Sequence, residues 1–103
     1  AMRDVHARGV VHRDLKLSNI ILTAGSTQRR PQCRLVDFGL ARRAAASSAS
    51  SLAGDGAGTP VYQAPEVLLG QSATPAADVY AFAIVMWEVI LPSLFAAAAL
   101  LFS

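Results

Sequence analysis

Charged residues are scarce in this 103-residue sequence, and cysteine is nearly absent. Asp, Glu, Lys and Arg make up 16% of the chain, against about 25% in an average soluble domain. The net charge is only +2, and no long basic stripe is present, which excludes a nucleic-acid-binding footprint. The single cysteine, Cys33, excludes an internal disulfide and favours a reducing compartment, so a cytoplasmic location is expected.

Metal-binding and targeting patterns are also missing. The two histidines, His6 and His12, have no third ligand nearby in the sequence, and no cysteine–histidine pattern of a zinc site occurs. The polar opening Met2-Arg3-Asp4 does not have the form of a signal segment. A start at Ala1 indicates a fragment or a processed chain.

Apolar residues, by contrast, are plentiful. They make up 53% of the chain, and the mean hydropathy is +0.41. A chain of this length forms one domain at most and can bury roughly two-thirds of its unfolded surface. Such a composition indicates a core that lacks some of its packing partners. Cys33, at the expected start of a strand, is predicted to be a small packed residue.

Three short segments carry the chemistry. Residues 12–19 read HRDLKLSN, residues 37–39 read DFG, and residues 58–66 read GTPVYQAPE. The first two segments combine carboxylates, an ammonium group and a carboxamide. Carboxylate and carboxamide oxygens are hard ligands for divalent cations. A positioned carboxylate with nearby positive charge is what phosphoryl transfer requires.

In this order and at these separations, the segments resemble the catalytic half of a eukaryotic protein kinase, of the serine/threonine type and the tyrosine-kinase-like group. The resemblance implies an α+β fold, mainly α: a partial C-lobe with short strands around the catalytic loop. It covers residues 1–92, with a catalytic loop at 12–19, an activation segment at 37–66 and a central helix at about 76–91. No Gly-x-Gly-x-x-Gly loop and no Val-Ala-Ile-Lys strand occurs, so the N-lobe is absent from these residues.

The resemblance also implies a role for each polar residue of the site. Asp14 would be the catalytic aspartate, and Lys16 would offset charge on the transferring phosphoryl group. Asn19 and Asp37 would hold Mg²⁺, and Thr59 would contact Asp14 and Lys16 on the acceptor platform. The implied cofactors are ATP and Mg²⁺, with Lys16, Asn19 and Asp37 on the nucleotide–metal side. The implied partner is a protein substrate with Ser or Thr hydroxyls. In the family, a lysine at the place of Lys16 indicates these acceptors.

Other residues have structural roles in the same comparison. His12 is expected to pack near Phe38, and Asp78 to brace the backbone of the catalytic loop. Glu66 pairs in the family with an arginine that this sequence does not contain. A buried and unpaired carboxylate is costly, so Glu66 must be exposed or have another partner.

Short apolar runs predict the regular elements. Residues 10–11 and 20–22 are expected to form a small strand pair, and residues 34–36 a strand that delivers Asp37. Residues 64–70 predict a short helix, with Pro65 in its first turn and Gly70 at its end.

Residues 44–58 are rich in Ala, Ser and Gly and predict a mobile segment. Four serines in it, Ser47, Ser48, Ser50 and Ser51, are candidate phosphosites by position only. The alternative, weighed equally, is a flexible loop that is never phosphorylated.

Residues 78–91 predict a buried helix, apolar nearly all round, which Pro92 closes. Residues 93–103 form an apolar tail that matches nothing expected of a kinase. Together with the helix, this tail is long enough for a membrane span, but a central Glu88 argues against one. A membrane partner is therefore the less favoured alternative, and it stays open.

Three functions remain open at this level. The preferred one is a protein serine/threonine kinase, whose complete form transfers the γ-phosphoryl group of ATP to protein hydroxyls. The second is a non-catalytic, truncated product that acts at most as an interaction segment. The third, which rests on residues 79–102 alone, is a membrane-tethered fragment.

Overall fold

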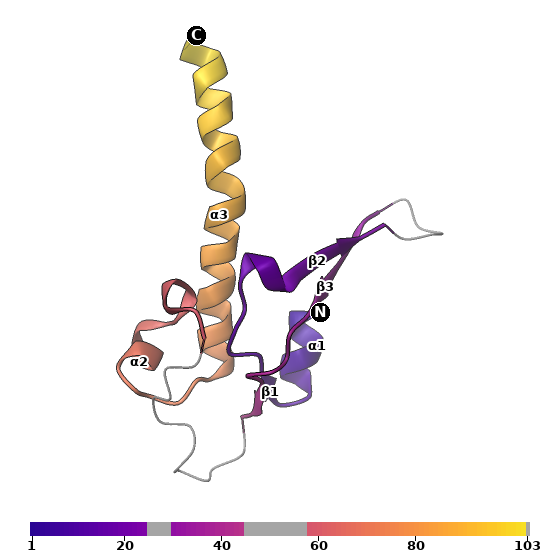
Figure 1. Cartoon of the computed structure of the whole chain (residues 1–103), viewed down its shortest axis with the longest axis vertical. Helices are drawn as coiled ribbons and strands as arrows, with labels where there is room; N and C mark the ends of the chain where they lie inside the picture. Colours follow the sequence, from indigo (N-terminus) through magenta and orange to yellow (C-terminus); the bar gives the residue numbers. More distant parts are fainter. Residues whose placement is uncertain (25–29, 45–57, 103) are drawn as a thin grey trace.

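Short strands and helices precede one long helix. The computed structural model describes residues 1–24, 30–44 and 58–102 (Figure 1). The candidate phosphosites, and most of the segment expected to be mobile, lie outside these residues. The elements in chain order are α1 (Met2–Ala7), β1 (Val10–Val11), the 3-10 helix η1 (Leu17–Asn19), β2 (Ile20–Thr23), β3 (Gln32–Leu35), β4 (Arg42–Arg43), the 3-10 helix η2 (Pro60–Tyr62), α2 (Pro65–Leu68) and α3 (Pro75–Phe102).

The strands form two separate antiparallel pairs. β2 pairs with β3, from Ile20 opposite Leu35 to Thr23 opposite Gln32. β1 pairs with β4, with Val10 opposite Arg43. The expectation that residues 10–11 and 20–22 pair with each other is wrong. The intervening loop and η1 separate β1 from β2, so each strand pairs with a later one. The β2–β3 hairpin points away from α3 (Figure 1).

Helix α2 begins and ends as its sequence predicts. Pro65 occupies the first turn, where its missing N–H costs nothing. Gly70 has a φ of +85° and follows the helix. The N–H of Gly70 bonds the carbonyl of Val67 at 3.0 Å, and the N–H of Gln71 bonds that of Glu66 at 2.9 Å. These two bonds form the Schellman arrangement that ends many helices.

Helix α3 does not stop at Pro92. It runs from Pro75 to Phe102 with Pro92 inside it, so the predicted end near residue 91 is wrong. Proline removes one N–H, and its ring crowds the carbonyl four residues earlier, here that of Glu88. The alanines that follow favour helix, and the Ser93 hydroxyl donates to the Val89 carbonyl at 3.4 Å. Local propensity beyond the proline therefore outweighs the interruption.

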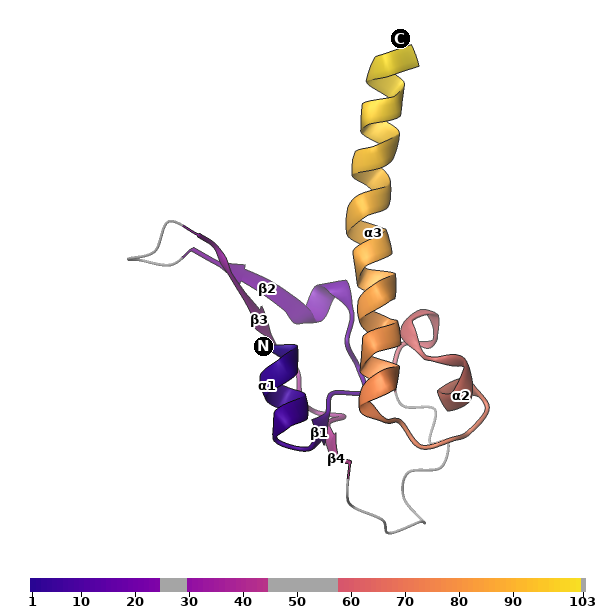
Figure 2. The same ribbon diagram turned by 180° about the vertical axis from the view of Figure 1, so that it is seen from behind.

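The surface of α3 is largely exposed. Only Ala77, Asp78, Ala81 and Val85 are buried on it among the residues whose burial is described, which contradicts the expectation of a buried helix. The C-terminal part of α3 stands clear of the other elements in two opposite views (Figures 1 and 2). By length and composition, residues 75–101 suffice to cross a membrane, with a mean hydropathy of 2.1 over their best window.

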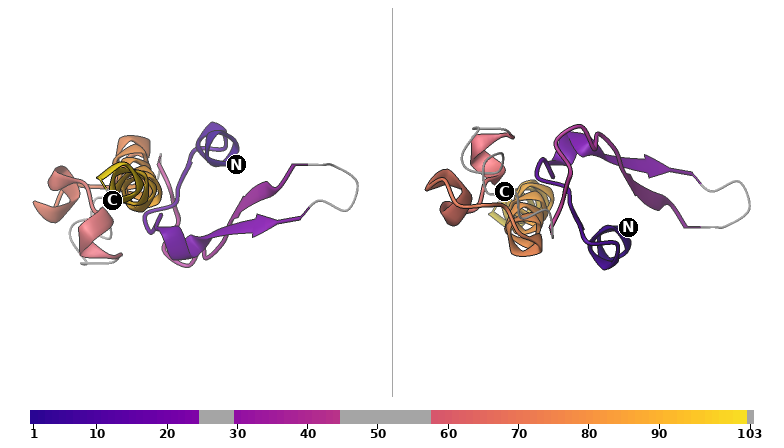
Figure 3. Two further views of the ribbon diagram at one scale, coloured as in Figure 1. Left: turned by 90° about the horizontal axis from the view of Figure 1, so that it is seen from above. Right: turned by 90° about the horizontal axis from the view of Figure 1, so that it is seen from below.

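The buried core is small and lies where α3 meets the catalytic loop. The chain extends over 56 × 38 × 18 Å, and α2 and the β2–β3 hairpin lie on different sides of α3 (Figure 3). An apolar groove of about 420 Å³ lies between the hairpin and α3. Cys33 lines it and is exposed, so the expectation of a packed cysteine is wrong. The buried apolar side chains are Val11, Leu15, Ala64, Ala77, Ala81 and Val85.

The mainly helical class with a few short strands is confirmed. The strands β1 and β2 border the loop of residues 12–19, and α3 supports this loop from one side (Figure 2). The loop therefore lies at the junction of the elements rather than at their periphery.

Candidate active site

The carboxylate of Asp78 holds the start of the catalytic loop. It is 1% exposed. Its Oδ2 accepts the backbone N–H of His12 at 2.8 Å, and its Oδ1 accepts that of Arg13 at 3.0 Å. His6 Nε2 lies 2.8 Å from the same Oδ2. The expected bracing of the loop by Asp78 is confirmed, and α1 shares it through His6.

These bonds fix an unusual backbone at Arg13. Its φ is +68°, a left-handed conformation that a non-glycine residue adopts at a cost. The Arg13 guanidinium also donates to the Leu40 carbonyl at 3.4 Å. The conformation turns the chain so that Asp14 follows directly after the anchored segment.

His12 supports the catalytic loop from inside. It is fully buried, and its ring meets the Phe38 ring edge-on with centroids 4.7 Å apart. Its Nδ1 accepts the N–H of Asp14 at 3.2 Å, and its Nε2 lies 3.1 Å from the Val36 carbonyl. One nitrogen accepting and the other donating corresponds to a neutral ring with the proton on Nε2. The predicted packing of His12 near Phe38 is confirmed.

Three predicted site residues come together around one hydroxyl. Lys16 Nζ donates to Thr59 Oγ1 at 3.1 Å, and Thr59 Oγ1 donates to Asp14 Oδ1 at 3.4 Å. Lys16 Nζ lies 3.8 Å from Asp14 Oδ2. Thr59 is more than forty residues away in the chain, so the fold brings these groups together. The expected contacts of Thr59 with Asp14 and Lys16 are confirmed.

Asn19 and Asp37 are linked through the backbone. Asn19 Nδ2 donates to the Asp14 carbonyl at 2.8 Å, which leaves its amide oxygen as the atom able to face a cation. The Val36 N–H bonds the Asn19 carbonyl at 2.9 Å, so Asp37 follows directly after a residue tied to Asn19. Asp37 is exposed, has a φ of +59°, and accepts the Gly39 N–H at 3.3 Å.

These donors suit magnesium held jointly with phosphates. In the described part of the chain, no group of three or more His, Cys, Asp or Glu side chains could hold a metal alone. Mg²⁺ is usually bound through one or two carboxylates plus substrate phosphates and water. Asp37 and the Asn19 amide oxygen offer hard oxygen ligands of that kind, so the residues present fit the ion.

Two supporting features were given no role in the sequence analysis. Gly58 has a φ of +108°, and a Cβ there would lie 3.1 Å from the Arg13 carbonyl and 3.0 Å from Gln63 Nε2. Tyr62 donates a 2.7 Å hydrogen bond to Glu88 on α3. Both features seat residues 58–62 against the loop and the helix. Gly58 stands beside Thr59, and this neighbour could have suggested its importance.

The hydrogen bond between Tyr62 and Glu88 also changes the acidity of the Tyr62 hydroxyl. It raises the pKa of the Tyr62 hydroxyl above its ordinary value of 10.0, with burial and the negative charge of Glu88 acting in the same direction. A backbone hydrogen bond at Leu17 acts the other way and is the smaller influence. Tyr62 therefore stays protonated throughout the physiological range.

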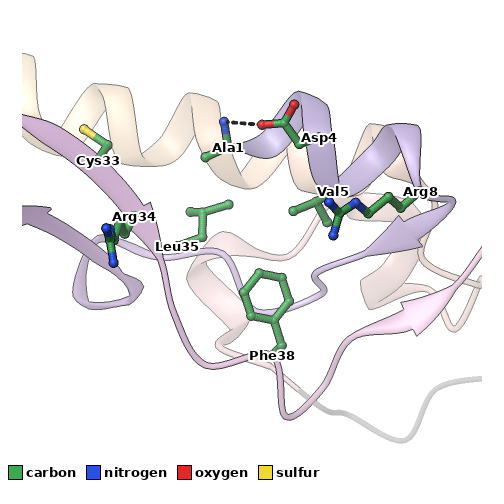
Figure 4. Close-up of a pocket in the computed structure, with 8 residues that line it drawn as sticks. All are labelled: Ala1, Asp4, Val5, Arg8, Cys33, Arg34, Leu35 and Phe38. Atoms are coloured by element: carbon green, nitrogen blue, oxygen red, sulfur yellow. Dashed lines mark ion pairs between the residues drawn. The ribbon is translucent and has the colours of Figure 1, made fainter.

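A separate cavity of about 330 Å³ lies between α1 and β3 (Figure 4). Leu35 and Val5 point toward each other in it, with the Phe38 ring beside them (Figure 4). Asp4 there pairs with the N-terminal amine of Ala1 at 3.1 Å. Asp14, Lys16 and Thr59 do not line this cavity, so it is distinct from the cluster around the Thr59 hydroxyl.

The family profile described as "Protein kinase domain" matches residues 1–98. The chain belongs to the protein kinase family. The match covers nearly the whole chain and extends beyond the boundary at residue 92 that the sequence indicated.

Similar proteins are named as serine/threonine kinases. The kinase chain is 40% identical over 90 residues to serine/threonine-protein kinase Pkn1 of Myxococcus xanthus, covering 87% of this chain and 13% of that protein. It is 39% identical over 90 residues to PknA of Mycobacterium tuberculosis, covering 87% and 20%. It is 36% identical over 88 residues to the mos kinase of Gallus gallus, covering 84% and 24%.

The kinase chain thus spans a quarter or less of the length of these relatives. Its family, from the profile match, is that of the protein kinases. ATP and Mg²⁺ are typical of this family. The catalytic roles of Asp14, Lys16, Asn19, Asp37 and Thr59 remain predictions for this chain.

Proposed function

We propose that these residues form the acceptor and metal side of a protein serine/threonine kinase site. The elements around the loop, with α3 as their support, would make up part of the C-lobe. The proposed substrates are Mg·ATP and a protein with exposed Ser or Thr hydroxyls. A cytoplasmic location, where ATP is available and Cys33 stays reduced, is proposed with it.

The contact of one hydroxyl, Thr59 Oγ1, with both Asp14 and Lys16 carries the proposal. It unites a carboxylate and an ammonium group from the loop with the segment of residues 58–66. Phosphoryl transfer depends on positioning and charge stabilisation rather than on covalent chemistry by the protein. A carboxylate held within 4 Å of an ammonium group, and oriented by a third group, meets that requirement.

Each residue has a defined part in the reaction. The acceptor oxygen attacks the γ-phosphorus, the bond from that phosphorus to the β,γ-bridging oxygen breaks, and ADP leaves. The acceptor proton passes to the Asp14 carboxylate, which acts as the general base. Lys16 offsets negative charge on the transferring group. Thr59 holds the Asp14 carboxylate and the Lys16 ammonium group in position through its hydrogen bonds to both.

Asn19 and Asp37 are the proposed ligands of the metal. Bound there, Mg²⁺ supplies charge neutralisation for the phosphate oxygens. The amide bond of Asn19 to the Asp14 carbonyl ties the metal side to the base side. Loss of either ligand should therefore weaken binding of the metal–nucleotide complex as well as turnover.

A chimera tests the proposal in a complete kinase framework. No Gly-x-Gly-x-x-Gly loop occurs in the 103 residues, so residues 10–92 would replace the matching stretch of the Myxococcus kinase. Phosphate transfer to peptides with a single Ser, Thr or Tyr would be measured with labelled ATP. Transfer to Ser and Thr peptides, with little to Tyr, is the expected result. A well-folded chimera that transfers no phosphate would contradict the proposal.

The variant Asp37→Asn in the chimera tests the proposed metal ligand. Asp55→Asn is the matched carboxylate-to-amide control, because no role in metal binding or in packing is proposed for Asp55. Asp37→Asn should weaken Mg²⁺-dependent nucleotide binding at least about ten-fold, as losses around metal sites typically do. Equal binding by the two variants would remove Asp37 from the site.

A further inference from the structure

The hydroxyl of Thr59 lies against the candidate base in the way that an acceptor hydroxyl must. Its Oγ1 donates to Asp14 Oδ1 at 3.4 Å and accepts from Lys16 Nζ at 3.1 Å. A hydroxyl has one proton to donate and two lone pairs, so these two bonds leave one lone pair of Oγ1 for a further interaction. A nucleophilic oxygen requires this state, in which its proton faces a base and a lone pair is available.

A second hydroxyl of the same segment shows how selective this arrangement is. Tyr62 also donates to a carboxylate, that of Glu88, at 2.7 Å. Glu88 belongs to α3, however, and the ammonium group of Lys16 bonds Thr59 instead. Of these two hydroxyls, only that of Thr59 therefore has both the carboxylate and the positive charge that phosphoryl transfer requires.

The backbone around Thr59 holds its hydroxyl in this position. A Cβ on Gly58 would lie 3.1 Å from the Arg13 carbonyl, so the segment passes close to the catalytic loop. The N–H of Tyr62 bonds the Thr59 carbonyl at 3.0 Å. Pro60 favours an extended backbone at Thr59, which has a φ of −97° and a ψ of 115°. The hydroxyl is thus held beside the base, and such positioning supplies a large part of catalysis.

We propose that Thr59 is phosphorylated within its own molecule and that this phosphate inactivates the site. The inference rests on the proposed function, because a nucleoside triphosphate must supply the phosphoryl group. Thr59 Oγ1 attacks the γ-phosphorus, and the bond from that phosphorus to the β,γ-bridging oxygen breaks. The nucleoside diphosphate leaves, and the Oγ1 proton passes to the Asp14 carboxylate.

The phosphate on Thr59 removes what the site needs for a peptide acceptor. The bond from Thr59 to Asp14 is lost with the hydroxyl proton, and about two negative charges now lie beside that carboxylate. The phosphate oxygens pair with the Lys16 ammonium group, which lies 3.1 Å from Oγ1 before the reaction. Asp14 and Lys16 are then no longer held together for a second hydroxyl.

Incubation of the chimera with Mg·ATP, without any peptide, tests the modification. Mass spectrometry locates the phosphate, which we expect on Thr59. The rate should not change with the concentration of the chimera, as a reaction within one molecule requires. Thr74 is the matched internal control, because it is exposed and also precedes a proline, and it should carry no phosphate. Equal phosphorylation of the two threonines would overturn the proposal.

A mixture of two chimeras separates a reaction within one molecule from a reaction between molecules. A tagged Asp14→Asn chimera, which lacks the base, is mixed with the untagged active chimera and Mg·ATP. Thr59 should become phosphorylated in the untagged chimera alone. Phosphate on Thr59 of the tagged chimera would overturn the intramolecular step.

Transfer to peptides, measured on the same samples, tests the inactivation. The modified fraction should transfer phosphate at least about a hundred-fold more slowly, because the contribution of the base is lost, and a phosphatase should restore its activity. Undiminished transfer would overturn the inactivation. Transfer to Ser and Thr peptides with Thr59 unmodified would overturn this inference alone. No transfer to peptides or to Thr59 would contradict the proposed function, and this inference with it.

The reactivity of Lys16 gives a readout without nucleotide. Chimeras prepared with a phosphate on Thr59 or on Thr74 are treated with an amine-acylating reagent, and mass spectrometry follows Lys16. The phosphate on Thr59 should slow acylation of Lys16 several-fold, because the two groups form an ion pair. The phosphate on Thr74 should leave the rate unchanged. Equal rates in the two chimeras would overturn the pairing with Lys16.

Discussion

The hydroxyl of Tyr62 lies 2.7 Å from the Glu88 carboxylate and donates a hydrogen bond to it. This bond connects η2, next to Thr59, with α3, which also carries Asp78. The position of Thr59 over the catalytic loop therefore depends on the same helix that anchors the loop. Helix α3 therefore supports both Thr59 and the catalytic loop.

This relationship predicts a loss of stability in alkaline solution. The pKa of Tyr62 is raised in the folded chain, first by the bond to Glu88, whereas the unfolded chain has the ordinary value of about 10. The folded state thus holds the proton more tightly. Its stabilisation is complete below about pH 10 and is lost as the pH rises through the raised pKa.

Tyr62→Phe should therefore lower the free energy of unfolding by about 1 kcal/mol at pH 7, and the difference from the original chain should shrink above about pH 10. Urea unfolding followed by circular dichroism measures both. Tyr80→Phe, on an exposed part of α3, is the control for loss of a tyrosine hydroxyl. A difference independent of pH would show that the bond does not control the titration.

Asp78 should be the most sensitive carboxylate for stability. Asp78→Ala leaves two N–H groups without an acceptor, the buried one of His12 and the partly buried one of Arg13. The expected loss is about 2–5 kcal/mol, because unsatisfied buried donors and broken buried charge pairs are costly. Asp4→Ala, at an exposed ion pair, should change stability by less than about 1 kcal/mol. Similar urea midpoints for the two variants would contradict the anchoring role.

Gly58 and Gly70 allow the stability cost of a strained backbone conformation to be separated from the cost of steric crowding. Both have positive φ, +108° and +85°, but only at Gly58 would a Cβ meet the Arg13 carbonyl, at 3.1 Å. Each change to alanine should cost about 1 kcal/mol or more through strained backbone. Gly58→Ala should cost more and should also reduce phosphate transfer in the chimera. Equal effects of the two variants on stability and transfer would show that the close approach is unimportant.

Local and family-wide features could be predicted from the sequence. Pro65 and Gly70 bracket α2 because one residue fits a helix start and the other a left-handed end. The contacts of Asp78 with the loop and of Thr59 with Lys16 followed from the family resemblance. In each case the residue types themselves impose the geometry, or the family pattern fixes it.

Features that depend on the rest of the fold could not be predicted. Pro92 indicated a helix end, but the alanines beyond it continue α3. β1 and β2 pair with other strands, because pairing depends on where the loop leads the chain. Cys33 is exposed because α3 and the hairpin stand apart rather than closing over it. The bond from Tyr62 to Glu88 joins distant positions that no local pattern links.

The most direct test of the catalytic assignment is turnover of the chimera after Asp14→Asn. The amide keeps the shape of the side chain and an acceptor for Thr59, but it cannot take the hydroxyl proton. We expect kcat to fall at least about a hundred-fold, within the range of general-base contributions, while nucleotide affinity stays nearly unchanged. Asp55→Asn, the control already paired with Asp37→Asn, should leave both values as they were. If Asp14→Asn retains full turnover, Asp14 is not the catalytic base and the account of the site is wrong.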